Sequence, residues 1–135
     1  MDDALRSFVR ERAGNRCEYC RIHQDQDPFF TFPIDHVIAR QHGGRTEADN
    51  LCLSCYRCNS HKGPNIAGID PKTKEMVRLF HPRQDSWADH FEWDDAILVG
   101  LTAIGRATVE LLAVNNPDYV LLRESLIEEG TFPPQ

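Results

Sequence analysis

Five cysteines in two groups constrain the fold of this chain more than any other feature of its sequence. Cys17 and Cys20 form one C-x-x-C motif, and Cys52, Cys55 and Cys58 form two overlapping ones. Two such pairs supply the four thiolates of a tetrahedral zinc site, with sulfurs about 2.3 Å from the ion. We therefore expect a zinc-braced fold, whose second pair is either Cys52 and Cys55 or Cys55 and Cys58.

Zinc is a better interpretation than disulfide bonds, because the number of cysteines is odd and the acidic start Met1-Asp2-Asp3 is unlike a signal sequence. No apolar run approaches the ~20 residues that cross a bilayer, so we expect a cytoplasmic protein with no membrane partner. The alternative in a reducing compartment is a redox pair, for which Cys52 and Cys55 are the candidates.

The composition is that of a small globular protein, with 135 residues, 41% hydrophobic and 27% charged. Acidic and basic side chains balance in residues 1–64, so the whole formal net charge of −6 falls on residues 65–135. A protein that coats duplex DNA would be more basic. Any contact with nucleic acid is therefore expected from a local patch in the first half.

Hydrophobic spacing and capping residues predict an α+β fold. In the first half we expect a helix over 3–13, two short strands within 28–41 around Asp35-His36, and a short helix from about Cys55 to Gly63. We interpret residues 1–64 as one domain that carries the chemistry.

The second half, 65–135, is predicted to be an extension packed on that domain. It should contain two extended pieces (65–69 and 76–80), a β-hairpin over 91–99, and two helices that begin after Thr102 and after Asn116. An aromatic cluster could stack on nucleobases, but it is better interpreted as the small core of this extension: Trp87, His90, Phe91 and Trp93.

A set of polar residues near the cysteines suits hydrolysis of a phosphodiester. This reaction needs a hard metal ion with oxygen ligands, a base that activates water, and positive charge near the phosphate. Asp35 and Asn59 can supply oxygen ligands, His36 the base, and Arg57 or Lys62 the charge. Solvated surface charges are the alternative for the last two.

The same residues lie in an ordered pattern: Cys17-x-x-Cys20, Ile34-Asp35-His36-Val37, Gly43-Gly44-x-Thr46, Asn50-Leu51-x-Leu53 and Cys55-x-x-Cys58-Asn59-x-x-Lys62-Gly63. Residues 17–63, about a third of the chain, resemble an HNH endonuclease domain. The resemblance implies a ββα-metal (His-Me finger) core braced by a structural zinc on four cysteines. It selects Cys55 and Cys58 as the second pair and leaves Cys52 as a thiol on a strand.

The resemblance also implies roles for the polar residues. His36 would be the general base, Asp35 and Asn59 would ligate a catalytic magnesium or manganese ion, and Asn50 would order the loop between strand and helix. Adjacent residues of a regular strand point to opposite faces, so a bend or bulge is expected if Asp35 and His36 both face the site.

The expected function is metal-dependent endonuclease cleavage of DNA, with double-stranded DNA as the expected substrate and a 5′ phosphate on the product. Nucleic-acid contacts are expected from Arg57, Lys62 and His61, although His61 could equally be a surface histidine. The alternative is a non-catalytic zinc-stabilised module that binds nucleic acid or protein.

Overall fold

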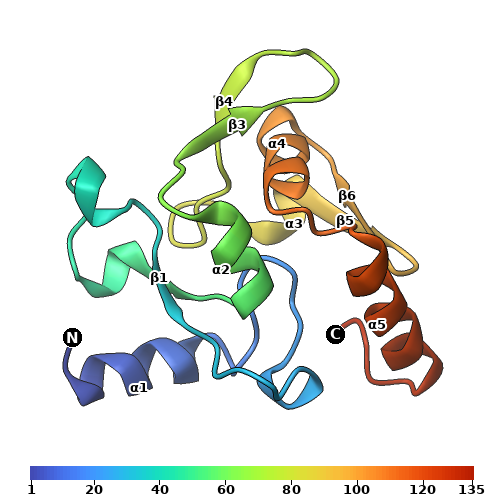
Figure 1. Ribbon diagram of the computed structural model, residues 1–135, viewed down its shortest axis with the longest axis horizontal. Helices are drawn as coiled ribbons and strands as arrows, with labels where there is room; N and C mark the ends of the chain where they lie inside the picture. The colour runs from blue at the N-terminus through green and yellow to red at the C-terminus, as the bar shows by residue number, and fades with distance from the viewer. The chain divides into compact units, whose positions relative to one another are not determined.

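The computed structural model describes residues 1–135 and contains five α-helices and six short strands, paired as three two-stranded antiparallel sheets (Figure 1). The predicted α+β class is confirmed. The chain divides into two compact units: Met1–Ile66 with His81–Gln84, and Ala67–Phe80 with Asp85–Gln135. None of the helices combines the length and the hydrophobicity of a membrane-spanning segment.

The first compact unit begins with α1 (Asp3–Arg12), which forms where the sequence predicts it. The Asp2 carboxylate caps the helix by accepting the Leu5 N–H at 2.8 Å. Arg12, in the last turn, donates to the backbone carbonyls of Ala48 and Leu51 at 2.9 and 2.7 Å. These bonds tie α1 to the segment that carries the next strand pair.

The centre of this unit is a ββα motif. β1 (Ile34–His36) pairs antiparallel with β2 (Leu51–Leu53), and α2 (Tyr56–Lys62) follows with Cys55 as its N-cap. The helix is where we predicted it. The prediction of two strands within 28–41 was wrong, since only β1 lies there and its partner is β2.

The missing strand has a physical reason, because side chains hold residues 28–33 as a loop. The Gln24 amide donates to the Phe30 carbonyl at 3.0 Å and accepts the Phe32 N–H at 2.7 Å. These hydrogen bonds occupy backbone N–H and C=O groups that a β-strand would need for pairing with a neighbouring strand.

The second compact unit contains the remaining elements: β3 (Ala67–Ile69), β4 (Met76–Arg78), α3 (Trp87–His90), β5 (Phe91–Asp94), β6 (Ile97–Gly100), α4 (Ala103–Leu111) and α5 (Pro117–Glu128). The two predicted extended pieces pair as β3 and β4, the predicted hairpin is β5 with β6, and both predicted helices are present with Thr102 and Asn116 as their caps. The short helix α3 was not predicted. In Figure 1, α4 lies against the β3–β4 hairpin, in agreement with their contacts.

The aromatic cluster is part of the core of this unit, as we interpreted it. The ring centroid of Trp87 lies 5.3 Å from that of Phe91 and 6.0 Å from that of Trp93, and the ring of Phe132 packs edge-on against Trp93. Base stacking by this cluster is therefore not supported.

Candidate functional site: a four-cysteine cluster beside a ββα motif

The four cysteines Cys17, Cys20, Cys55 and Cys58 are buried, and their sulfurs all lie within 4.8 Å of one another. The Sγ atoms of Cys20 and Cys55 are 3.8 Å apart. Zinc with four bonds of about 2.3 Å in a tetrahedron places its sulfurs about 3.8 Å apart. The cluster is therefore compatible with a structural zinc.

Cys52 is not a member of this cluster. It lies on β2, and its buried Sγ is 3.6 Å from the Tyr19 hydroxyl and 3.8 Å from the Asp35 carboxylate. The cluster that could hold zinc therefore takes Cys55 and Cys58 as its second pair, as the resemblance implied, and the Cys52–Cys55 alternative is not supported.

The first C-x-x-C motif is joined to β2 through Glu18, which lies inside the motif. Its N–H donates to the Leu53 carbonyl and its carboxylate accepts the Leu53 N–H, both at 2.8 Å. The same carboxylate forms an ion pair with Arg83. The sequence assigned no role to Arg83, because it lies 65 positions from Glu18. Residues His81–Gln84 belong to the first unit.

His36 lies at the end of β1 and is partly exposed. Its Nε2 is 2.9 Å from the Thr46 hydroxyl. This bond fixes the orientation of the ring and leaves Nδ1 for a second partner. No role was assigned to Thr46 from the sequence. The one feature that could have pointed to it is its position in the Gly43-Gly44-x-Thr46 part of the family pattern.

The amide of Asn50 closes the loop that carries Thr46. It accepts the Ile38 N–H at 2.9 Å and donates to the carbonyls of Ile38 and Arg45 at 3.0 and 2.9 Å. The backbone of Gly44 lies so close to that of Ile38 that a Cβ at position 44 would be 1.7 Å from the Ile38 carbonyl oxygen. The loop between β1 and β2 is therefore ordered by one side chain and one obligatory glycine.

Asp35 is buried and points to the face of β1 opposite to that of His36, because β1 pairs with β2 in regular register. No bulge interrupts the strand pair, but the chain bends directly after His36, at Val37 and Ile38. The Asp35 carboxylate lies 3.1 Å from the Lys62 ammonium and accepts from the Tyr19 hydroxyl at 3.0 Å. Burial raises the pKa of Asp35 above its ordinary value, while Lys62 and the hydrogen bonds oppose this rise.

Lys62 is only 1% exposed, and its ammonium also donates to the His36 carbonyl at 3.3 Å. It was expected at the surface as a phosphate contact, and the structure places it under β1. Its charge compensates a buried carboxylate, which would otherwise be strongly destabilising.

The other predicted site residues lie on α2. Asn59 is partly exposed, and its side-chain amide makes no hydrogen bond within the protein. His61 is exposed, and the Arg57 guanidinium lies 3.5 Å from the Asp27 carboxylate.

A divalent ion can be held by few protein groups when phosphate and water complete its shell, as is common for magnesium. Asp35 and Asn59 supply the carboxylate and amide oxygens that suit such an ion. A carboxylate has about four acceptor positions, so the contacts of Asp35 with Lys62, Tyr19 and Cys52 leave capacity for a metal. The two oxygen donors suit the chemistry of such an ion, and Lys62 would remain paired with Asp35.

The segment that contains the cysteine motifs and the ββα motif is similar to a known protein family. Residues 17–65 match the HNH endonuclease family, which confirms the resemblance inferred from the sequence.

Two Septu proteins are also similar to the chain. PtuB of Bacillus thuringiensis is 25% identical over 130 residues, which cover 95% of this chain and 48% of that protein. PtuA of Bacillus mycoides (strain KBAB4) is 25% identical over 148 residues, covering 93% of this chain and 21% of that protein. The chain therefore spans about half of the first relative and a fifth of the second. No solved structure matches significantly.

Proposed function

We propose that the chain is a metal-dependent endonuclease that hydrolyses DNA phosphodiester bonds. The observation that carries this proposal is His36, oriented by Thr46 at 2.9 Å within a ββα motif braced by four cysteines. The match of residues 17–65 to the HNH endonuclease family supports it.

In this proposal His36 accepts a proton from the attacking water. Imidazole is the side chain most often used as a general base near neutral pH. Thr46 holds the ring, and Asn50 holds the loop that carries Thr46. The base is thus positioned by hydrogen bonds from outside its own strand.

Asp35 and Asn59 are proposed to hold a magnesium or manganese ion, which would neutralise charge on the phosphate and on the departing oxygen. Asp35 supplies the charged oxygen and Asn59 a neutral one. We assign Lys62 to hold the Asp35 carboxylate and the His36 carbonyl in place. Its burial does not support the direct phosphate contact expected from the sequence.

Contacts with DNA phosphates are proposed for Arg57 and His61 on α2. Arg57 would exchange Asp27 for a phosphate oxygen as a charge-assisted donor, and His61 would donate through a ring N–H. We expect few such contacts, since residues 1–64 have no net charge. Affinity for DNA should therefore depend only moderately on salt.

The extension 65–135 is proposed to act with the nuclease domain 1–64 as one functional unit, because the similarity to PtuB covers 95% of this chain. A cytoplasmic location belongs to the same proposal, since zinc-binding thiolates need a reducing environment.

The test is cleavage of supercoiled plasmid by the zinc-loaded chain with and without added magnesium or manganese. Asp35→Asn and Asn59→Ala should need more divalent ion for half-maximal cleavage, and Asp35→Asn should be affected more because it removes a charge. Asp49→Asn, an exposed acid in the same unit, is the matched control. Equal ion dependence in all variants would refute the assigned ligands.

One observation favours the alternative, a zinc-stabilised binding module without catalysis. Asp35 already has a cation, Lys62, at 3.1 Å, and a carboxylate compensated by the protein itself does not need a metal ion. This alternative predicts that the chain binds DNA and that no divalent ion produces cleavage.

A further inference from the structure

Three aromatic side chains on the surface of the first compact unit have no role in its core or in the proposed hydrolysis. Phe29 is 87% exposed, Phe30 56% and Tyr56 49%. The rings of Phe30 and Tyr56 are stacked, with centroids 4.5 Å apart and planes at 19°. Exposed aromatic surface of this kind is unfavourable in water and indicates a binding site.

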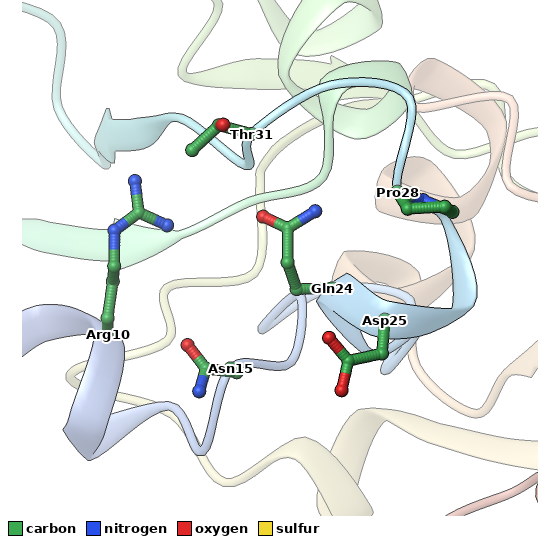
Figure 2. A pocket seen from close by; sticks show the side chains of 6 residues that line it. All are labelled: Arg10, Asn15, Gln24, Asp25, Pro28 and Thr31. Atoms are coloured by element: carbon green, nitrogen blue, oxygen red, sulfur yellow. The ribbon is translucent and has the colours of Figure 1, made fainter.

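The loop that carries Phe29 and Phe30 is held in place from inside. Gln24 bonds the backbone of Phe30 and Phe32, and Arg10 donates to the Phe32 carbonyl at 2.8 Å. Figure 2 shows Arg10 and Gln24 beside the loop, at an open hollow of about 370 Å³. The two phenylalanines are therefore presented by an anchored backbone, which lowers the entropy lost when a ligand binds.

The stacked pair lies close to the proposed catalytic groups. Tyr56 is the first residue of α2, and Asn59 follows three positions later. Residues at this spacing lie on the same side of a helix, about one turn apart. A nucleotide that contacts Tyr56 would thus be within about one nucleotide's length of a phosphate at Asn59.

We propose that Phe29, Phe30 and Tyr56 form a base-stacking platform for unpaired nucleotides next to the cleaved bond. This proposal rests on the proposed nuclease function and narrows its substrate to DNA with a single-stranded or unpaired segment. Every base has a face that stacks on an aromatic ring. In a duplex both faces are covered by neighbouring pairs, so a base must leave the stack to reach the platform.

The neighbouring charge also suits a nucleic acid. Arg57 follows Tyr56 directly and can contact the backbone of a strand whose base lies on the platform. Stacking platforms combined with basic groups bind single strands with little sequence preference. We therefore expect the platform to recognise the unpaired state of the strand, with little preference for sequence.

The experiment measures binding of a 16-nucleotide single strand and of the same sequence as a duplex, without a divalent ion, so that no cleavage occurs. The single strand carries 2-aminopurine, whose fluorescence is quenched by stacking. Wild type should bind the single strand more tightly and quench it. Tyr56→Ala and Phe29→Ala should each weaken binding about 5- to 150-fold, the usual worth of one base stack.

Two further variants separate stacking from simple apolar contact. Tyr56→Trp keeps an aromatic face and should keep single-strand binding, whereas Tyr56→Leu keeps apolar area only and should behave like the alanine variant. Phe8→Ala is the matched control, since Phe8 is 49% exposed on α1 of the same unit. Zinc content and circular dichroism confirm that each variant is folded.

The platform is overturned if wild type binds the single strand no more tightly than the duplex, if the alanine variants bind normally, or if Tyr56→Leu restores binding. The last result would mean that apolar contact, and not base stacking, accounts for the binding. Plasmid cleavage is scored separately. Single-strand binding without any cleavage would refute the nuclease function and keep the platform, while cleavage without single-strand preference would refute the platform alone.

Discussion

Replacing Lys62 with methionine should destabilise the protein strongly, although Lys62 was expected to be a surface residue. The ammonium is 1% exposed, with the Asp35 carboxylate at 3.1 Å and the His36 carbonyl at 3.3 Å. Methionine keeps most of the volume and removes the charge, so the buried carboxylate loses its cation. Removing one partner of a buried ion pair costs about 3–5 kcal/mol. Urea unfolding of zinc-loaded protein at neutral pH measures this loss.

The pH dependence of this loss identifies its cause. Burial raises the pKa of Asp35, and Lys62 opposes the rise, so the Met variant should have a still higher pKa in the folded state. When folding raises the pKa of a carboxyl group, the folded state binds its proton more tightly than the unfolded state does. The free energy of unfolding therefore rises as pH falls through the folded pKa, and this gain is complete below the unfolded pKa of about 3.9. The difference between Lys62→Met and wild type should therefore shrink as pH is lowered from neutral.

The double variant Asp35→Asn with Lys62→Met is the control, because it contains neither charge. At neutral pH it should recover most of the free energy of unfolding that Lys62→Met loses. The remaining difference from wild type should not shrink as pH is lowered. A loss below about 1 kcal/mol for Lys62→Met, the range of an exposed pair, would refute the reasoning. The same loss at every pH would also refute it.

Three further predictions concern the zinc, the loop and the DNA contact. Cys55→Ser should lose zinc and most of its stability, whereas Cys52→Ser should keep the metal, as measured by metal analysis and thermal unfolding. Asn50→Ala removes three hydrogen bonds to Ile38 and Arg45; it should cost about 1–3 kcal/mol and slow plasmid cleavage with zinc retained. Arg57→Ala should weaken DNA binding equally for different sequences and reduce its salt dependence, as measured by titration at several salt concentrations.

Features that depend on local sequence were predictable. Asp2, Thr102 and Asn116 cap their helices as expected, because a cap requires only a suitable side chain a few residues from its acceptor. The four cysteines gather as the family resemblance implied, whereas spacing alone had left two choices for the second pair. Both kinds of signal lie in short stretches of the chain.

Features that depend on which side chains meet in the folded chain were not predictable. Residues 28–33 are rich in aromatic residues typical of strands, but Gln24 holds their backbone as a loop. The charge of Lys62 predicted exposure, and only the folded chain shows that Asp35 compensates it. The pairing of Glu18 with Arg83 depends on a segment that joins the first unit from far along the sequence.

The central claim, that His36 is the base of a nuclease, is tested most directly by the rate of plasmid cleavage by His36→Ala at saturating magnesium or manganese. Zinc content and DNA affinity should equal those of wild type, while cleavage should fall by about 10²- to 10⁴-fold, the usual contribution of a positioned base. Cleavage by His36→Ala at nearly the wild-type rate would contradict the account.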